Sequence, residues 1–443
     1  MLSTFSDLCL GETADAVFLG GLYSVLYLYG SDEQREQLLK SIRHVLKPDG
    51  CLLILEQGPR ASAEGTAPSR WISPDLVIEQ LRFHAFELEK ARSLDDGRYL
   101  LRFHPTPPAN RLSGTPISPE AVRRLSDGSL EIQGPQSLLH LGTASPSNEL
   151  KLGGQLLLGG IEKGDRPALA AAQAQFERAA ASSPAGDELG PVRWFAEILL
   201  GEKEPPSDPV WGYYYRFFAK DNFAELRWFL RGKYSPDGSE EDDTADARRL
   251  WSLQELLCFQ SPVREEWEKS SVLMENLGVE PGQAIADIGS GPGFHTFQFA
   301  NKVGPAGCVF AVETNPFHIT YLTDTLASAG IHNVRVVRGK EDDLTLEEKT
   351  LDLAFMCSVY HMSYAMTAES ERLAWLQSIK KALKPNGRLA VVDNAIVPAG
   401  AAPYRGPRIA KELIVAQLER LGFRLMSERL IVPQRYLLIF KSK

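Results

Sequence analysis

The residues with the clearest chemical potential lie in one stretch, "QAIADIGSGPGFHTF", at residues 283–297. Its apolar start predicts a strand, which leads through Asp287 into a turn that contains Gly289, Gly291 and Gly293. Glycines allow a backbone to bend sharply and a ligand to approach its N–H groups. The helix expected after the turn would point its N-terminus at a negative group. The stretch therefore predicts a ligand-binding site at the end of a strand.

The spacing of the glycines separates two ligand classes. The dinucleotide fingerprint G-x-G-x-x-G needs glycine where this chain has Phe294, which makes a nicotinamide-dependent oxidoreductase the weakest interpretation. The observed D-x-G-x-G-x-G resembles the class I S-adenosylmethionine (SAM)-dependent methyltransferases. The resemblance covers about residues 255–443. Its other segments are "SPVREEWEKSSVLMENLGVEPG" as a leading helix, "VFAVE", "GKEDDL", "CSVYHM" and "LKPNGRLAVVD".

The resemblance implies SAM as cofactor and a role for each matching residue. The three glycines would let the backbone approach the methionine part of SAM, and Asp287 would orient water or the amino group. Glu313 would accept hydrogen bonds from both ribose hydroxyls; independently, a carboxylate about 20 residues past the glycines suits a diol. Asp342 or Asp343 would take the adenine amino group, although adjacent acids are also common in solvated loops.

The candidates for catalysis follow the fourth expected strand of this domain. Tyr360 and His361 would lie at the carboxyl edge of the sheet, where ligands of α/β proteins bind. Histidine suits proton abstraction from an acceptor because its pKa is near neutral, but a structural role for this histidine is the other interpretation. The segment is not of the N/D-P-P-Y type, which disfavours base or amide nitrogens as acceptors. No metal-ligand cluster with a recognisable spacing stands out.

A repeat relates the two ends of the chain. "KSIRHVLKPDGCLLIL" (40–55) matches "QSIKKALKPNGRLAVV" (377–392), and adding 337 to each residue number also superimposes 77–103 on 414–440. We interpret this as a duplicated half-domain. The first copy lacks every cofactor-binding segment and has Ser24 in place of His361. A truncated reading frame or a decayed domain is the favoured origin, and a homo-oligomer or another partner is expected to cover its open strand edge.

Alternating strands and helices predict an α/β fold: a Rossmann-like, doubly wound, seven-stranded sheet at the C-terminus and a partial copy at the N-terminus. A helical middle region separates them; its aromatic run 211–234 is interpreted as packing, and 118–125 as a short helix. The predicted domains are a partial methyltransferase-like domain at 1–105, a Pro/Gly/Ser-rich connector at 106–150, a helical region at 151–234, an acidic linker at 235–246 and the methyltransferase domain at 247–443.

Composition narrows the class of protein. A net charge of −9 argues against a large nucleic-acid interface and leaves a small molecule as the default acceptor. Five scattered cysteines fit reduced thiols in the cytoplasm. The apolar stretch 16–30 is too short to span a membrane and is expected to be a strand that runs into a loop. The competing hypothesis is a non-catalytic scaffold, in which SAM is a structural ligand or is absent.

Overall fold

We describe the protein from a computed structural model. The structure describes residues 13–29, 32–58, 72–84, 86–94, 97–105, 122–124, 130–133, 138–141, 146–182, 188–234, 245–340, 342–395, 408–432 and 435–442. Among these residues, no helix is both long and apolar enough to cross a membrane.

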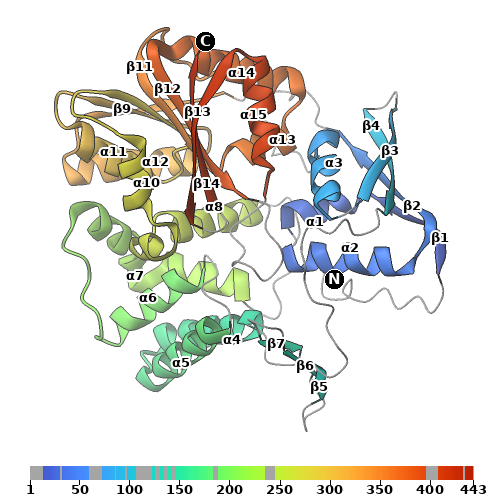
Figure 1. Cartoon of the computed structure of the whole chain (residues 1–443). Coiled ribbons are helices and arrows are strands. Elements are labelled where there is room, and N and C mark those ends of the chain that lie inside the picture. Colours follow the sequence, from blue (N-terminus) through green and yellow to red (C-terminus); the bar gives the residue numbers. More distant parts are fainter. Residues whose placement is uncertain are drawn as a thin grey trace.

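A seven-stranded sheet forms the centre of the C-terminal domain (Figure 1). Its order is β10-β9-β8-β11-β12-β14-β13, and only the pairings of β14 with β12 and β13 are antiparallel. The predicted doubly wound sheet is thereby confirmed. The strands are β8 (Ala284–Ile288), β9 (Cys308–Glu313), β10 (Val334–Arg338), β11 (Leu351–Cys357), β12 (Leu383–Asn394), β13 (Phe423–Val432) and β14 (Arg435–Ser442).

Helices cover this sheet, and apolar side chains from both are buried between them. The predicted leading helix is broken: Lys269 has a left-handed backbone (φ 55°), which separates two short helices. The helical elements are η3 (Pro262–Arg264), α9 (Glu265–Glu268), α10 (Ser270–Leu277), α11 (Phe294–Val303), α12 (Pro316–Ala329), α13 (Tyr360–Met366), α14 (Glu369–Ala382) and α15 (Lys411–Arg420).

The N-terminal unit is a four-stranded sheet with three helices, in the order β1-β2-β4-β3. Its pairings repeat those of β11-β12-β14-β13, from the parallel first pair to the antiparallel last pair. The elements are β1 (Ala14–Gly20), α1 (Tyr23–Tyr29), α2 (Asp32–Val45), β2 (Leu46–Gln57), α3 (Pro74–Phe83), β3 (Phe86–Ser93) and β4 (Arg98–Pro105). After 337 is added, every first residue coincides with that of the C-terminal counterpart. The stretch expected to be a strand and a loop is instead a strand followed by helix α1.

Polar contacts inside the two units also correspond. In each unit a tyrosine after the first strand donates to a glutamine, another tyrosine donates to a backbone carbonyl, and a lysine pairs with an aspartate. The contacts are Tyr23–Gln80 (2.9 Å) and Tyr360–Gln417 (2.5 Å), Tyr99–Ile72 (2.8 Å) and Tyr436–Ile409 (3.0 Å), and Lys47–Asp15 and Lys384–Asp352 (both 2.7 Å).

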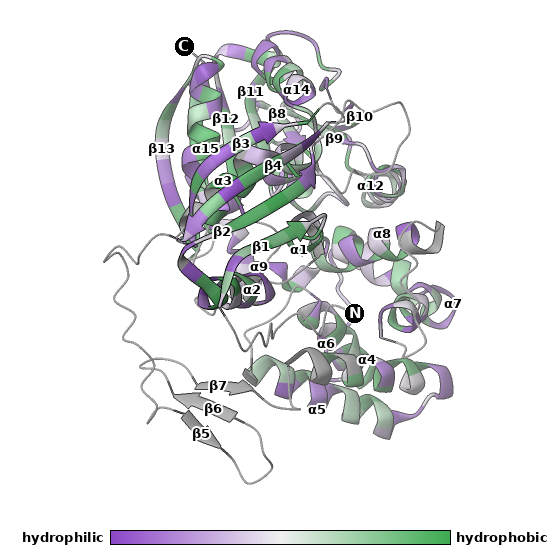
Figure 2. Ribbon diagram, turned by 90° about the vertical axis from the view of Figure 1, so that its right-hand side faces the viewer, coloured by the Kyte–Doolittle hydropathy of each residue, from purple (hydrophilic) through white to green (hydrophobic). Residues whose placement is uncertain are grey.

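The N-terminal unit packs against the C-terminal domain through one continuous apolar core. Tyr27 Oη and Gln80 Nε2 donate to the backbone carbonyl of Arg408 at 3.3 and 3.1 Å. Figure 2 shows the apolar strand β2 between β1 and β4. In the described chain the other edge of β1 carries no strand, whereas β11 pairs with β8 there. Phe18 is accordingly 58% exposed, and its counterpart Phe355 is fully buried.

The middle region is mostly helical. Its helices are α4 (Pro146–Lys163), α5 (Arg166–Ser182), α6 (Leu189–Leu199), α7 (Pro209–Tyr234) and α8 (Ala245–Phe259). α7 is kinked at residues 220–223, where three residues have positive φ. Before α4 lie three short strands, β5 (Val122–Arg124), β6 (Leu130–Gln133) and β7 (Leu138–Leu141). The helix predicted over 118–125 is therefore wrong at 122–124. Most of the predicted linker 235–246 lies outside the described residues.

Candidate functional site

The glycine turn connects β8 to α11, as the sequence predicts. Gly289, Gly291 and Gly293 have φ values of 68°, 53° and 105°. A Cβ at Gly289 would lie 2.5 Å from Val359, and one at Gly293 would lie 2.6 Å from Leu322, so both positions need glycine. A Cβ at Gly291 would meet nothing within 4 Å. The turn is therefore tight against the protein at two glycines and open to a ligand at the third.

Asp287 lies at the base of this turn and is 3% exposed. Its carboxylate accepts a hydrogen bond of 2.6 Å from the hydroxyl of Thr296, in the first turn of α11. Burial raises the pKa of Asp287 to about 7, against the opposing effects of the Thr296 hydroxyl and the charge of Arg264. Its protonation therefore changes near neutral pH.

Glu313 ends β9 beside the turn and holds several backbone groups. Its Oε2 accepts from the N–H of Gly291 at 2.6 Å, and its Oε1 accepts from the N–H groups of Thr314 and Asn315 at 2.7 and 2.8 Å. Asn315 in turn caps α12 by accepting from the N–H of Phe317. Glu313 therefore ties the glycine turn to the start of α12.

The two acids of the loop after β10 are exposed. Asp343 Oδ1 accepts from the N–H of Thr345 at 2.9 Å, a local turn contact. The exposed carboxylate of Asp342 has no hydrogen bond among those found in the described residues. The adenine-binding role of Asp342 or Asp343 stays a prediction.

Asp393, which the sequence did not single out, connects β12 to His361. Both side chains are buried. His361 Nδ1–H donates to Asp393 Oδ1 at 2.6 Å, and the backbone N–H of His361 donates to Oδ2 at 3.0 Å. A carboxylate that binds Nδ1–H leaves Nε2 of the neutral ring able to accept a proton. In the N-terminal unit Glu56 and Ser24 occupy the same positions and also share a hydrogen bond, of 2.9 Å.

Tyr360, the other catalytic candidate, is 1% exposed and donates its hydroxyl to Gln417. Burial raises its pKa above the usual range, which opposes proton transfer near neutral pH. The N-terminal unit contains the same contact between Tyr23 and Gln80. This geometry fits packing of α13 against α15.

A buried charged cluster surrounds Glu268 at the carboxyl ends of β8 and β11. Arg264 binds both carboxylate oxygens of Glu268, and Arg435 Nη1 lies 3.2 Å from Oε1. Burial alone would raise the pKa of Glu268, but the charges of the two arginines hold it well below its usual range. The i,i+4 spacing of Arg264 and Glu268 was the only sequence signal for this cluster.

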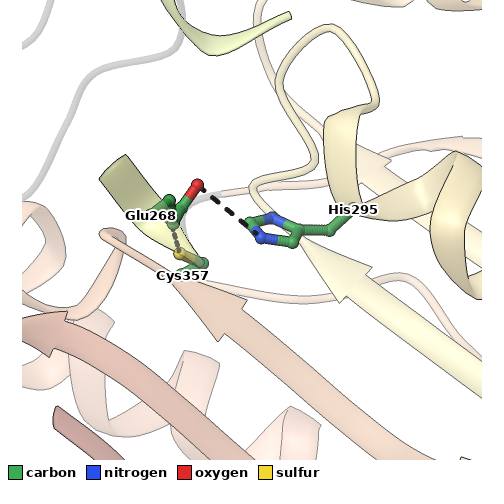
Figure 3. A group of neighbouring side chains, drawn as sticks. All are labelled: Glu268, His295 and Cys357. Carbon is green, nitrogen blue, oxygen red and sulfur yellow. Dashed lines mark hydrogen bonds and ion pairs between the residues drawn. The ribbon is translucent and has the colours of Figure 1, made fainter. Parts of the chain in front are cut away.

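Glu268, His295 and Cys357 bring three metal-type donor atoms together (Figure 3). Cys357 Sγ lies 3.5 Å from Oε1 of Glu268, and His295 Nε2 lies 4.0 Å from Oε2 of the same carboxylate. Arg435 Nη2 also donates to Cys357 Sγ at 2.9 Å. Because two guanidinium groups already neutralise the only carboxylate, the cluster is built as an ion-pair network and is poorly suited to a cation.

The strand order, the glycine turn and the acid at the end of β9 are those of the class I SAM-dependent methyltransferase fold. Residues 280–420 match the family model described as "Methyltransferase domain". SAM is the cofactor of this domain. The site fits it: Gly291 is open to a ligand, and the buried Ser290 Oγ has no hydrogen-bond partner in the described structure.

Curated relatives match this same domain. The chain is 29% identical over 142 residues to the ubiquinone/menaquinone biosynthesis C-methyltransferase UbiE of Idiomarina loihiensis, covering 32% of this chain and 53% of the relative. It is 28% identical over 113 residues to the arsenite methyltransferase of Halobacterium salinarum, covering 26% of this chain and 27% of the relative. The chain thus spans about half of the first relative and a quarter of the second.

Among solved structures, the chain matches a SAM-dependent methyltransferase from Aquifex aeolicus. It is 23% identical, with a TM-score of 0.37 over 41% of this chain and 93% of that one. The assignment of the fold rests on the strand order and the family match.

The pKa of Asp287 predicts how SAM binding depends on pH. We expect the carboxylate of Asp287 to attract the ammonium group of SAM, and Asp287 is protonated below about pH 7 in the free protein. We expect the affinity for SAM to rise by up to about tenfold per pH unit between pH 5.5 and 7 and then to level off. Isothermal titration at several pH values measures this. In Asp287→Asn the slope should disappear; a slope that persists would assign it to another group.

Proposed function

We propose that this protein transfers a methyl group from SAM to a small-molecule acceptor. The observation that carries the proposal is the open glycine turn tied to Glu313 at the carboxyl ends of β8 and β9. SAM supplies an activated methyl group, so the main task of the protein is to hold donor and acceptor in line. The two relatives are named for different acceptors, and the matches cover only parts of them. The nature of the acceptor therefore rests on this chain's own charge of −9 and on the absence of a recognisable recognition motif.

His361 is the proposed general base. Asp393 fixes the ring so that Nδ1 carries the proton and Nε2 can accept one from a hydroxyl or amine acceptor. Asp393 also binds the N–H of His361 at the start of α13, so it positions both the ring and the helix. Tyr360 is left out of this catalytic group because its hydroxyl is engaged in the core.

We infer that the N-terminal unit arose by duplication. Its elements start at matching positions and it keeps matching polar contacts, but it contains no counterpart of the glycine turn or of β9 among its described residues. Ser24 replaces the proposed base. The described residues contain the glycine turn of the C-terminal domain, and we expect one SAM site there.

The function is tested by titration of SAM into the full chain, followed by incubation with tritiated SAM and low-molecular-mass extracts. One binding site per chain and label in a small molecule would support the proposal. Binding without transfer would favour the scaffold, and label found only in protein or nucleic acid would overturn the acceptor class.

Once an acceptor is found, His361→Gln is expected to lower the rate of methyl transfer by about 100-fold, the usual contribution of a general base. SAM affinity should stay within about twofold, because the substitution removes no cofactor contact. His332→Gln, at an exposed position, is the matched control. An unchanged rate in His361→Gln would show that the ring is structural.

A further inference from the structure

The helical middle region packs directly on the cofactor-binding half of the methyltransferase domain. Aromatic side chains of α7 lie against α12: the rings of Tyr213 and Phe217 are 5.5 and 5.4 Å from that of Tyr321. Trp211 lies 5.9 Å from Phe294, the first residue after the glycine turn. Tyr321 belongs to the apolar core of the helical region. The helical middle region therefore borders the glycine turn through packed aromatic side chains.

Helix α8 brings polar groups to the same place, and Figure 2 shows it next to α12. Asn315 Nδ2 donates to Ser252 Oγ at 3.2 Å. One turn further along α8, Glu255 Oε2 lies 3.5 Å from Nε2 of His318. His318 is 3% exposed, and its Nε2 has no hydrogen-bond partner in the described structure, so its approach to Glu255 is a close polar contact and not a hydrogen bond. The side chain of Glu255 is 26% exposed, so a ligand can reach it.

Glu255 contacts His318 in α12, and Glu313 accepts from the N–H of Asn315 at the start of the same helix. Burial raises the pKa of Glu255 above its usual range, and the negative charge of Glu313 adds to this effect while a hydrogen bond with Trp251 opposes it. Two acids that approach each other in a partly buried place destabilise a fold. Such pairs are characteristic of binding sites.

The hydrogen-bond capacity of Glu313 explains why a second acid is needed. A carboxylate accepts about four hydrogen bonds, two at each oxygen. Oε1 of Glu313 already accepts from the N–H groups of Thr314 and Asn315 and, at 3.4 Å, from the hydroxyl of Thr314, and Oε2 accepts from the N–H of Gly291. Only one position remains, at Oε2. The ribose of SAM presents two hydroxyl donors, so one of them needs another acceptor.

We propose that Glu255, which lies beside His318, is a second ribose-binding residue of the SAM site and is supplied by the helical region. This inference rests on the proposed function, because it requires SAM at Glu313. Glu313 accepts one ribose hydroxyl and the carboxyl of Glu255 accepts the other. A carboxyl group offers an acceptor oxygen in either protonation state. The helical region is thereby part of the cofactor site.

The test is isothermal titration of the full chain with S-adenosylhomocysteine and with its 2′-deoxy and 3′-deoxy analogues. We expect Glu255→Ala to weaken binding of the parent ligand by about tenfold, the loss typical of one hydrogen bond to a charged group. One of the two deoxy analogues lacks the hydroxyl that Glu255 binds. Wild type and Glu255→Ala should bind that analogue with equal affinity. A role of Glu255 in packing alone would weaken all three ligands alike.

Glu225→Ala is the matched control, since Glu225 lies in the same region and pairs with Arg249 at the surface. Its affinity should equal that of the wild type, and thermal melting should show that both variants are folded. If Glu255→Ala does not fold, Glu255→Gln provides the same comparison. If the wild type binds the ligands and the Glu255 variants bind each of them with the same affinity, the inference about Glu255 is wrong and the proposed function stands. A wild type that binds no ligand overturns the proposed function as well.

Discussion

Replacement of Glu313 with alanine is expected to lower SAM affinity by about 100-fold or more. The substitution removes the acceptor of a ribose hydroxyl. It also releases the N–H of Gly291, so the glycine turn loses its tie to the end of β9. Two hydrogen bonds to a charged group together account for a loss of this size. The measurement is isothermal titration of SAM at pH 7.5, where Asp287 is largely ionised.

Glu275→Ala is the control for this experiment, because Glu275 is an exposed acid on α10 of the same domain. It should bind SAM as the wild type does. An affinity loss below about fivefold in Glu313→Ala would contradict the assignment of Glu313 to the ribose. It would also remove the basis for the inference about Glu255.

Replacement of Glu268 with alanine is expected to destabilise the protein by about 3–5 kcal/mol, the cost of removing one partner from a buried ion pair. Arg264 and Arg435 would remain buried at the ends of β8 and β11 without their shared carboxylate. Urea denaturation followed by tryptophan fluorescence measures the change in the free energy of unfolding. The transition that reports the methyltransferase domain should move to lower urea.

Glu266→Ala provides the comparison, since Glu266 is in the same turn and its side chain is 62% exposed. Its contact with Arg193, at 3.8 Å, is a surface ion pair and should contribute less than about 1 kcal/mol. Similar stabilities of the two variants would show that the arginines find other partners when Glu268 is absent.

The parts of the site that could be predicted from sequence are those made by neighbours in the chain. Asp287 and the glycines belong to one strand-turn-helix unit, and Gly289 and Gly293 are required by their positive φ and by close contacts. Glu313 follows at the end of the next strand, and parallel strands end at the same edge of a sheet. The repeat could be seen because one offset relates apolar and glycine positions over two long segments.

Errors arose where local signals were weak or overridden. "SPEAVRRL" has helix-forming residues, but Val122–Arg124 pairs with β6 as a strand. The leading segment has apolar residues at helical spacing throughout, but Lys269 turns the chain between α9 and α10. That break follows Glu268, which the arginines hold at the strand ends.

By itself, the sequence determined the cofactor class, the alternating α/β order and a repeat with one offset of 337 residues, because these depend on residue type and local spacing. The tertiary structure alone decided which distant polar groups meet: Arg435 with Glu268, Asp393 with His361, and Glu255 with His318. Each of these pairs joins different helices or strands, and charges become strong partners only where folding removes both from water. The chain topology decides which helices and strands come into contact. The periodicity of the sequence predicts single elements and does not predict these contacts.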